Sequence, residues 1–580
     1  MGLTSKQKEY IHKNIKHFPI ETLAENLDVE QEIIKKYLKK IWRLEKYNKY
    51  TRNNTPGDIP ENRQTDFVFA EFFQKNLFIF IGLFFLIFVI YFNSLGSGFV
   101  SDDIPVISGS TATIKNFSNI LDPSLLGSLQ RFFHFTIVSL FGLSPFFFRL
   151  INVISHIGSV FLIFSILSII SKKRIAVFAA ILFAVHPVLT ETVVWISAMP
   201  YALSVFMFLI SFFLFITRIN KKRLFASYFF FFLALIASEK IIPLFLIFII
   251  FEFIWGNLKN NWKKLLPYAG LSFIWAIIYI SKIGQRMASI KTEEYQDTNI
   301  HSIFVQIPIA IINYLKLLLW PDKLSLYHTE MSFSSGTYIF MLFIFILFLA
   351  AIIFTWKKNK TVFFWLSFFL IALSPTLTPL GVSWIVAERY VYLGSIGIFV
   401  VVAIFFNWVW EKAQEKNEKY KHALVALFVI IILSLSIRTI IRGMDWKNED
   451  TLWIATAKTS PSGQVIHNNL GDVYARQGNP EKAVEEFKKA VEINPRYADA
   501  YHNLGNTYRD MGKIDLAIEN YQKALEFNPR LWQSYQNLAA ISFNQGDFQK
   551  ASEYIEQALQ IDPQNKNLQE NLQVIRGKIP

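Results

Sequence analysis

Two adjacent carboxylates, Asp102 and Asp103, are the residues of this sequence most suited to acid–base chemistry. They lie in "FVSDDIPVI", residues 99–107, a few residues after an apolar run long enough to cross a membrane. Because two like charges side by side cannot both ionise freely, the pKa of one is pushed toward the range of a general base. The pair also has two simpler interpretations, a solvated turn and a pair of metal ligands.

Further ionisable residues stand at the ends of other apolar runs. They are Arg131 and His134, then His186 and Glu191 in "FAVHPVLTETVVWISAMP", Glu239 and Lys240 in "SEKIIP", and Glu388, Arg389 and Tyr390 in "AERYVYLGS". Each alone has an ordinary explanation, such as a local ion pair or a histidine that is satisfied at a helix end. A charge in mid-bilayer costs about 2.5–3.5 kcal/mol, so loops that all place such groups on one predicted face indicate a site.

A metal site is an alternative use of the carboxylate pair. Asp102 and Asp103 could bind a divalent cation such as Mg²⁺ or Mn²⁺, but no third ligand follows at metal-binding spacing. The chain has no Cys, which removes disulfides, thiolate ligands and thiol nucleophiles from consideration. We therefore assign no metal ion to the site, and a divalent cation bound by Asp102 and Asp103 stays an alternative.

The composition places most of the chain in lipid. Hydrophobic residues make up 53% of the 580 residues, and there are 58 Phe, more apolar surface than a soluble core can use. The formal charge of +14 would suit a nucleic-acid partner, but basic residues collect in the cytoplasmic loops of membrane proteins. Nucleic acid is therefore disfavoured as a partner, and a lipid bilayer is expected.

The apolar body, 77–441, predicts eleven membrane spans. We place them near 77–95, 146–170, 175–190, 201–217, 224–237, 241–256, 264–282, 337–355, 361–378, 391–410 and 422–441. With the N-terminus cytoplasmic, the basic loops "SKKR", "RINKKR", "NLKNNWKK", "KKNK" and "EKAQEKNEKYKH" all fall inside. This holds only if 301–324 does not cross, and its Gln306, Asn313 and Lys316 fit an interfacial or re-entrant helix.

The polar tail, 442–580, repeats with a period of 34 residues. Gly478, Gly512 and Gly546 are followed at fixed distances by Ala490, Ala524 and Ala558 and by Pro495, Pro529 and Pro563. This is the period of the tetratricopeptide repeat, two antiparallel helices per unit. We expect repeats at about 464–497, 498–531 and 532–565, preceded by a half repeat, and the prediction places them on the same outer face as Asp102 and Asp103.

The polar head reads as a small helical domain, 1–50, followed by a linker, 51–76. Ala24, Leu27, Val29 and Ile34 fall at helix-turn-helix spacing, with Asp28 at the turn position where Gly is usual. For a domain tethered to a membrane we favour a cytosolic docking or packing module over a DNA-binding one. The predicted fold class is all-α throughout: the small head, a polytopic helix bundle and an α-solenoid.

The order of these motifs resembles a known family. The "DD" loop, "NVISH", "AVHPVLTE", "SEK", "AERYVYLGS" and the tandem repeats are similar to the transmembrane-and-tetratricopeptide-repeat O-mannosyltransferases and their bacterial relatives, of the GT-C class of glycosyltransferases. The similarity covers 77–580. The chain departs from the family at Met199 and Arg149, where the family often has Arg and His.

The resemblance implies a GT-C fold and a sugar, mannose or another hexose, carried on a polyprenyl phosphate as co-substrate. One of Asp102 and Asp103 would accept the proton of an acceptor hydroxyl. The configuration at the anomeric carbon of the sugar would invert in a single step. Arg389, with Lys240 and Arg131, would bind the donor phosphate, because a guanidinium grips phosphate oxygens with two prongs. His186, Glu191, Glu239, Glu388, Tyr390 and His134 would support them, and the repeats would recruit an acceptor protein or peptide.

Two other functions are open to such a chain. A transporter would need polar residues along several spans, and His156 beside Asn152 is nearly the only such place. A membrane-anchored tetratricopeptide scaffold without catalysis would not need eleven spans or the outer carboxylates. We therefore expect a multi-pass plasma (inner) membrane enzyme with its N-terminus cytoplasmic and its repeats extracytoplasmic.

Overall fold

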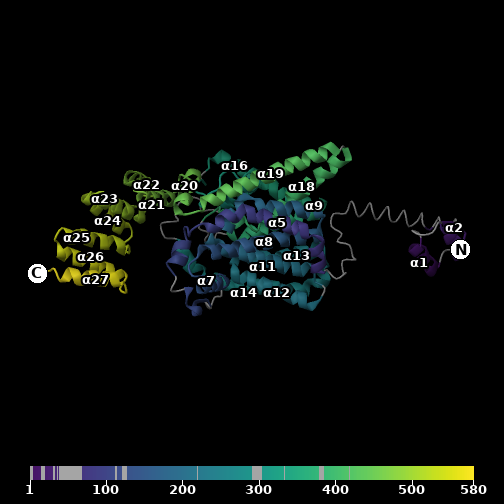
Figure 1. Cartoon of the computed structure of the whole chain (residues 1–580), viewed down its shortest axis with the longest axis horizontal. Helices are drawn as coiled ribbons and strands as arrows, with labels where there is room; N and C mark the ends of the chain where they lie inside the picture. The colour runs from purple at the N-terminus through teal and green to yellow at the C-terminus, as the bar shows by residue number, and fades with distance from the viewer. Residues whose placement is uncertain are drawn as a thin grey trace.

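The computed structural model describes residues 4–14, 20–30, 33–34, 37, 68–110, 114–120, 127–218, 220–290, 303–331, 333–377, 384–416 and 418–579. Within these ranges every regular element is a helix and none is a strand, which confirms the all-α prediction. Figure 1 shows a large helical body with a slender array of paired helices attached at one end.

The body contains long and short helices joined by tight turns. The helices are α4 (Phe69–Lys75), α5 (Leu77–Tyr91), α7 (Ser128–Phe141), α8 (Pro145–Ile170), α9 (Lys173–Val185), α10 (Thr190–Val194), α11 (Met199–Ile216), α12 (Lys221–Ala237), α13 (Phe245–Ile254), α14 (Leu258–Ile290), α15 (Ile303–Leu319), α16 (Ser335–Lys358), α17 (Lys360–Leu373), α18 (Ser395–Lys416) and α19 (Glu418–Asp445). The turns that matter for the site are η2 (Phe92–Gly96), η3 (Ile104–Ser108), η5 (Pro187–Leu189), η6 (Ile196–Ala198), η7 (Glu239–Leu244) and η10 (Glu388–Val391).

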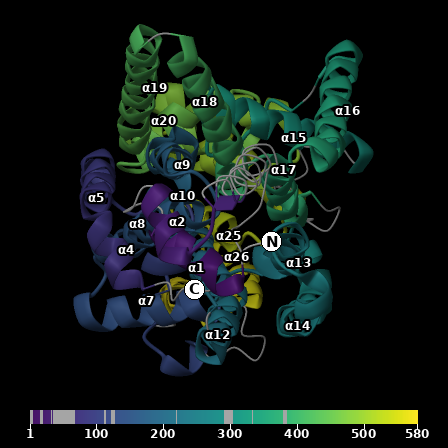
Figure 2. The ribbon, with the colours of Figure 1, turned by 90° about the vertical axis from the view of Figure 1, so that its right-hand side faces the viewer.

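Helix α5 shows why these helices need lipid. Its sequence, LFIFIGLFFLIFVIY, is apolar on every side; Leu83 and Ile87 are buried in the bundle, whereas Phe78 is 88% exposed and Val89 64% exposed. Exposed apolar surface costs about 25 cal/mol per Å² in water but nothing comparable in hydrocarbon. Helix α16 stands at the edge of the bundle in Figure 2, and only 6% of its most apolar stretch is buried inside the protein.

The predicted count of eleven spans is not confirmed. Seven described helices are long and apolar enough to cross a membrane: Leu77–Gly96, Pro145–Ile170, Ile196–Ile216, Leu258–Gly284, Ser335–Lys358, Ser395–Glu415 and Lys419–Asp445. An eighth is possible if α9 and Pro187–Val194, which meet at 54°, form one bent span. The other predicted segments contain helices too short for a hydrocarbon core about 30 Å thick: α12 has 17 residues, α13 has 10 and α17 has 14.

Two of the basic loops are in contact with each other. The Lys172 ammonium lies 2.6 Å from a Glu411 carboxylate oxygen, and the Arg174 guanidinium lies over the Trp410 ring at 4.7 Å. These contacts join the loop before α9 to the end of α18. Helix α15 is joined to α16 near its start: the Tyr338 hydroxyl donates to the Phe304 carbonyl at 3.2 Å. The start of helix α15 therefore lies beside the start of α16.

The tail forms a regular solenoid of helix pairs. Its helices are α20 (Glu449–Thr459), α21 (Gln464–Arg476), α22 (Pro480–Ile493), α23 (Ala498–Asp510), α24 (Ile514–Phe527), α25 (Trp532–Asn544), α26 (Phe548–Ile561) and α27 (Lys566–Arg576). Gly478, Gly512 and Gly546 have φ of 73°, 74° and 81°, the left-handed conformation that glycine adopts without strain. A side chain at Gly471 would meet the Phe487 ring at 2.7 Å, which is why a small residue stands where paired helices touch.

Part of the head is described as well. Helices α1 (Ser5–Asn14) and α2 (Ile20–Leu27) enclose a small core of Ile11, Ala24 and Ile34. Asp28 has φ of +50°, so it takes the left-handed turn conformation for which Asp is more tolerant than most residues. Much of the rest of 1–50 and most of the linker 51–76 lie outside the described residues.

Candidate functional site

Asp103 is fully buried and held by three hydrogen bonds. One carboxylate oxygen accepts from the Ser197 backbone N–H at 2.8 Å and from the Ser197 hydroxyl at 2.5 Å. The other accepts from the Val100 N–H at 3.3 Å. Burial raises the pKa of Asp103 to about 6, although Ser197, Val100 and the charge of Arg149 oppose the rise. Asp103 therefore fixes the loop to η6 and titrates in the range of a general base.

Asp102 is exposed and borders on charged neighbours from distant parts of the chain. The pKa of Asp102 lies above its usual value. Burial of the carboxyl group and the charge of Glu449 raise it, and the charge of Arg389 partly offsets the rise. The preceding residue, Ser101, has φ of +52° and donates its N–H to the Glu449 carboxylate. The two adjacent acids thus differ in role: Asp103 is buried in the protein, and Asp102 lies at the surface, within the electrostatic influence of Arg389.

Arg149 holds the backbone ahead of this loop. Its guanidinium donates to the carbonyls of Ser97 at 2.7 Å, Gly98 at 2.9 Å and Val194 at 2.7 Å. The side chain is completely buried in α8, so its charge is compensated by carbonyl dipoles and by Asp103. Met199, the other departure from the family, is buried in an apolar cluster with Phe148 and Ile196.

Arg389 forms the central ion pair of the site with Glu191. The guanidinium and the backbone N–H of Arg389 both donate to the Glu191 carboxylate, the latter at 3.1 Å. The guanidinium also lies over the Trp195 ring at 5.2 Å and the Tyr390 ring at 5.1 Å. Burial alone would lower the pKa of Arg389, but the charge of Glu191 raises it well above the usual value, so the group stays cationic.

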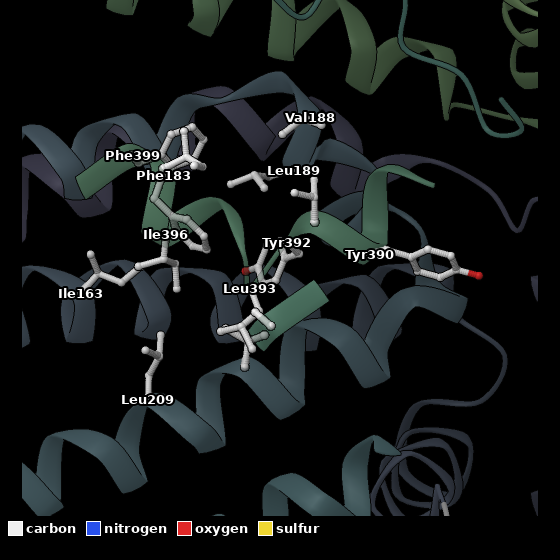
Figure 3. Packing of buried hydrophobic residues seen from close by; sticks show 14 of the residues in the cluster. Ile163, Phe183, Val188, Leu189, Leu209, Tyr390, Tyr392, Leu393, Ile396 and Phe399 are labelled. Atoms are coloured by element: carbon white, nitrogen blue, oxygen red, sulfur yellow. The ribbon is translucent and has the colours of Figure 1, made fainter. Parts of the chain in front are cut away.

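Lys240 and Tyr390 complete a small cavity beside this pair. The Lys240 ammonium lies 3.3 Å from the Glu239 carboxylate and 5.6 Å from the centre of the Tyr390 ring. Together with Tyr201 and Arg389 they line a cavity of about 20 Å³, room for a single water molecule. Figure 3 shows Tyr392 directed into the packed cluster of Ile163, Leu189 and Ile396, while the Tyr390 hydroxyl points away from it.

The other predicted residues lie outside this cavity. One Glu388 oxygen accepts from the Ser325 N–H at 2.6 Å and from the Arg442 guanidinium at 3.3 Å, so Glu388 joins η10 to α19. One ring nitrogen of His186 contacts the Leu318 carbonyl at 3.0 Å and the other accepts from the Val188 N–H at 3.3 Å. His186 therefore closes α9, begins η5 and fastens α15.

Arg131 and His134 line a second hollow, of about 380 Å³, on the other side of the carboxylate loop. Its wall includes Pro105 and Val106, which follow the acid pair after Ile104. Arg131 donates to the Ser128 hydroxyl at 2.9 Å, whereas Arg131 Nε and His134 Nε2 are buried without a hydrogen-bond partner. Burial lowers the pKa of His134 to about 4, so its ring is neutral at neutral pH.

A metal-binding geometry is not evident. Among the described residues no three His, Cys, Asp or Glu side chains gather closely enough to hold an ion, and both oxygens of Asp103 already accept hydrogen bonds from the protein. The carboxylate pair alone would leave most of the coordination shell of Mg²⁺ or Mn²⁺ to water or substrate. We derive no chemical step through a metal.

Four residues that shape the site were missed by the sequence analysis: Ser197, Arg149, Tyr201 and Glu449. Ser197 and Tyr201 stand in or next to the quoted stretch "FAVHPVLTETVVWISAMP", and Arg149 is a basic residue inside an apolar run, which is rare enough to need a partner. Glu449 carries no comparable signal, because acidic residues are ordinary in the first turn of a helix.

Fold and site together define a class: a multi-pass helical membrane protein joined to a tetratricopeptide-repeat solenoid, with ionisable residues gathered where the two meet. The family model for the tetratricopeptide repeat matches residues 464–530 and 496–564. The predicted repeats are thereby confirmed.

The predicted resemblance to O-mannosyltransferases is confirmed as a partial similarity. The chain is 29% identical over 120 residues to "Protein O-mannosyl-transferase Tmtc2" of Drosophila melanogaster, covering 21% of this chain and 12% of that protein. It is 32% identical over 114 residues to TMTC3 of Mus musculus, 20% of this chain and 12% of the relative, and 28% identical over 163 residues to TMTC3 of Homo sapiens, 28% and 17%. The matched region thus spans less than a fifth of these relatives.

Solved structures align with this chain only at low structural similarity. "Crystal structure of MamA protein" aligns at 24% identity over 22% of this chain and 69% of that chain, with a TM-score of 0.20. The Cut9 and Hcn1 hetero-tetramer structure aligns at 12% identity over 80% of this chain and 99% of that chain, with a TM-score of 0.23. These scores are too low to support a shared overall fold.

Proposed function

We propose that this protein is a membrane glycosyltransferase that moves a hexose, such as mannose, from a polyprenyl-phosphate donor to a hydroxyl of an extracytoplasmic protein. The observation that carries the proposal is that the loop of Asp102 and the Arg389 side chain converge on residues 191–197, because Asp103 accepts from Ser197 and Arg389 donates to Glu191. Residues 287 positions apart in the sequence come close enough for the guanidinium to act on the pKa of the carboxyl. A base and a phosphate-binding cation in the same region are what this reaction needs.

Asp102 is the better candidate for the base. Its carboxylate is exposed, whereas both oxygens of Asp103 are occupied by Ser197 and Val100. A general base must come within about 3 Å of the hydroxyl proton that it accepts, which an exposed carboxylate can do. We assign Asp103 the task of holding the loop, so that Asp102 stays in place.

Arg389 and Lys240 are the candidates for the donor phosphate. Glu191 fixes one edge of the Arg389 guanidinium, and Lys240 lies on the same cavity. A cavity of about 20 Å³ does not admit a sugar phosphate, so donor binding requires Tyr201, Lys240 or Tyr390 to move. Arg131 borders the separate hollow of 380 Å³ and is the candidate for a contact on the far side of the acid loop.

The reaction then balances without a covalent enzyme intermediate. The acceptor oxygen attacks the anomeric carbon as the bond from that carbon to the phosphate oxygen breaks, and the configuration inverts. The hydroxyl proton passes to Asp102, and the lipid phosphate leaves with its bonding electron pair. Arg389 and Lys240 stabilise the charge that develops on the leaving phosphate.

The tetratricopeptide solenoid would supply the acceptor. Such arrays bind extended or helical peptides along their inner surface, and this one begins directly at the site, because α20 contacts the loop that carries Asp102. We place the solenoid and the site outside the cell membrane and the basic loops in the cytoplasm, as the distribution of Lys and Arg favours. The membrane would be the plasma membrane.

The test is sugar transfer by the purified full-length chain from a radiolabelled polyprenyl-phosphate mannose to a protein acceptor. We expect transfer by the parent and loss of transfer in Arg389→Lys, because an ammonium keeps the charge but not the two-pronged grip. Thr507→Ser, a conservative change within the solenoid, is the matched control. A parent chain that transfers no hexose from any polyprenyl phosphate would contradict the proposal.

A further inference from the structure

The loop that carries Asp102 is fastened to the first helix of the repeat domain. One oxygen of the Glu449 carboxylate accepts from the Ser101 N–H, and the other accepts from the Trp453 indole N–H at 3.0 Å. Ser101 has φ of +52°, a conformation that costs a residue other than glycine free energy and persists only where the surroundings impose it. Glu449 supplies that restraint at the residue next to Asp102.

A second hydrogen bond ties the same loop to the start of α20. The Gly98 N–H donates to the Lys447 carbonyl at 2.9 Å, while Arg149 binds the Ser97 and Gly98 carbonyls from the other side. The loop is therefore held between α8 of the membrane body and residues 447–449 of the repeat domain. Removal of either support would loosen the backbone of 97–103, although Asp103 stays bound to Ser197.

Charge reinforces position at this contact. The charged groups that act on the pKa of Asp102 are Arg389 on η10, which lowers it, and Glu449 on α20, which raises it. Burial and the charge of Glu449 raise the pKa of Asp102, and Arg389 lowers it. A change at Glu449 should therefore alter both where the carboxylate lies and the pH at which it loses its proton.

The first turn of α20 faces the site and the solenoid at once. Asp450, the neighbour of Glu449, accepts from the Arg476 guanidinium and the Gln477 amide of α21, both at 3.0 Å. Further along, the Ser460 hydroxyl donates to the Ser325 hydroxyl at 3.0 Å, and the Ser325 N–H donates to Glu388. One helix thus joins the first repeat to two segments that border the site.

We infer that Glu449 is a positioning residue for Asp102, so that the leading helix of the repeat domain completes the candidate active site. The expected loss of turnover rests on the proposed function, whereas the expected loosening of residues 97–103 does not. It makes the repeat domain a part of the catalytic unit in addition to a surface for recruiting the acceptor.

The full-length chain with Glu449→Ala, Glu449→Gln or Asp450→Asn provides the test. Glu449→Ala should lower kcat by about 10- to 100-fold, the cost of a catalytic group displaced by up to about 1 Å, with a smaller effect on KM. Glu449→Gln keeps an oxygen for the Ser101 N–H but loses the charge, so the acid limb of the pH–rate profile should move to lower pH. The matched control Asp450→Asn removes a neighbouring acid that contacts only the solenoid and should leave both unchanged.

Two further measurements extend the test. They distinguish the effect of Glu449 on the position of Asp102 from the effect of its charge, and they distinguish failure of this inference from failure of the proposed function. Glutamine has one acceptor oxygen for two donors, so Glu449→Gln is also measured on a Trp453→Phe background, where the second donor is gone. Hydrogen exchange of residues 97–103 is measured in each variant, and it should be faster in Glu449→Ala than in Asp450→Asn.

The outcomes are distinct. Unchanged exchange in Glu449→Ala, together with a pH profile of Glu449→Gln that matches the parent, would overturn the role of Glu449. Faster exchange in Glu449→Ala together with full sugar transfer by Asp102→Asn would confirm that Glu449 holds the loop. It would refute the assignment of Asp102 as the base.

Discussion

Exchange of each carboxylate for an amide separates the two acids of the loop. Asp102→Asn removes the proposed base while leaving a side chain of the same size, so turnover should fall by about two to four orders of magnitude. At 1.36 kcal/mol per tenfold change, this corresponds to about 3–5 kcal/mol of lost transition-state stabilisation. Folding should hardly change, because Asp102 is exposed and no hydrogen bond from its side chain is among those that fix the loop.

Asp103→Asn should behave differently. The amide oxygen can still accept from Ser197, but its NH₂ group would face the Val100 N–H, and a buried donor without an acceptor costs about 1–3 kcal/mol. That cost strains the loop and lowers turnover by no more than about a hundredfold. Ser197→Ala, which removes one of the same hydrogen bonds, should reproduce part of the loss.

The assay is initial-rate transfer from polyprenyl-phosphate mannose to an acceptor protein, with donor binding measured separately by its effect on melting temperature. From fastest to slowest, we expect the parent, Ser197→Ala, Asp103→Asn and Asp102→Asn. The reverse order for the two acids would assign the base to Asp103. Near-parent rates for both amides would refute any chemical role for the pair.

The remaining predictions concern the ion pair, pH, the length of the tail and the topology. Glu191→Gln should destabilise the protein by about 3–5 kcal/mol, because it leaves the Arg389 cation buried without its counter-ion, and an unchanged melting temperature would contradict this. Because burial raises the pKa of Asp103 from 3.8 in the unfolded chain to about 6, the folded state binds the extra proton between these values. Stability should therefore fall by about 3 kcal/mol as the pH rises from about 4 to about 6, and denaturation of Asp103→Asn should lack this slope. A chain that ends after residue 463 keeps α20 and should transfer sugar to a small soluble acceptor, whereas one that ends after residue 445 lacks Glu449 and should not; equal activity of the two would show that α20 is dispensable. Single cysteines placed at Asp58 and Asp515 should be labelled by an impermeant reagent in intact cells only at 515, and labelling at 58 alone would reverse the topology.

Much of the architecture could be predicted from the sequence because it depends on local repetition. The 34-residue spacing of Gly478, Gly512 and Gly546 reflects a turn that needs a left-handed residue in every unit. Apolar runs such as that of α5 likewise identify helices in lipid, because no other backbone conformation satisfies its hydrogen bonds there. The number of spans was harder to predict, because it depends on where helices such as α9 and α13 begin and end. Pro187 follows the early end of α9, and the turn η7 delays the start of α13.

The residue types of the candidate site were visible in the sequence, but their roles were decided by the tertiary structure. "DD" is symmetric as a sequence, yet one acid is buried and bound by Ser197, whereas the other is exposed and under the electrostatic influence of Arg389. His186 and Glu388 looked equivalent to Glu191, but they fasten α15 and α19. Such differences depend on the rotation and tilt of helices hundreds of residues apart, and these follow from the packing of the whole bundle. The periodicity of one segment determines which of its faces is apolar, whereas only the assembled bundle determines which side chain from another segment that face will meet.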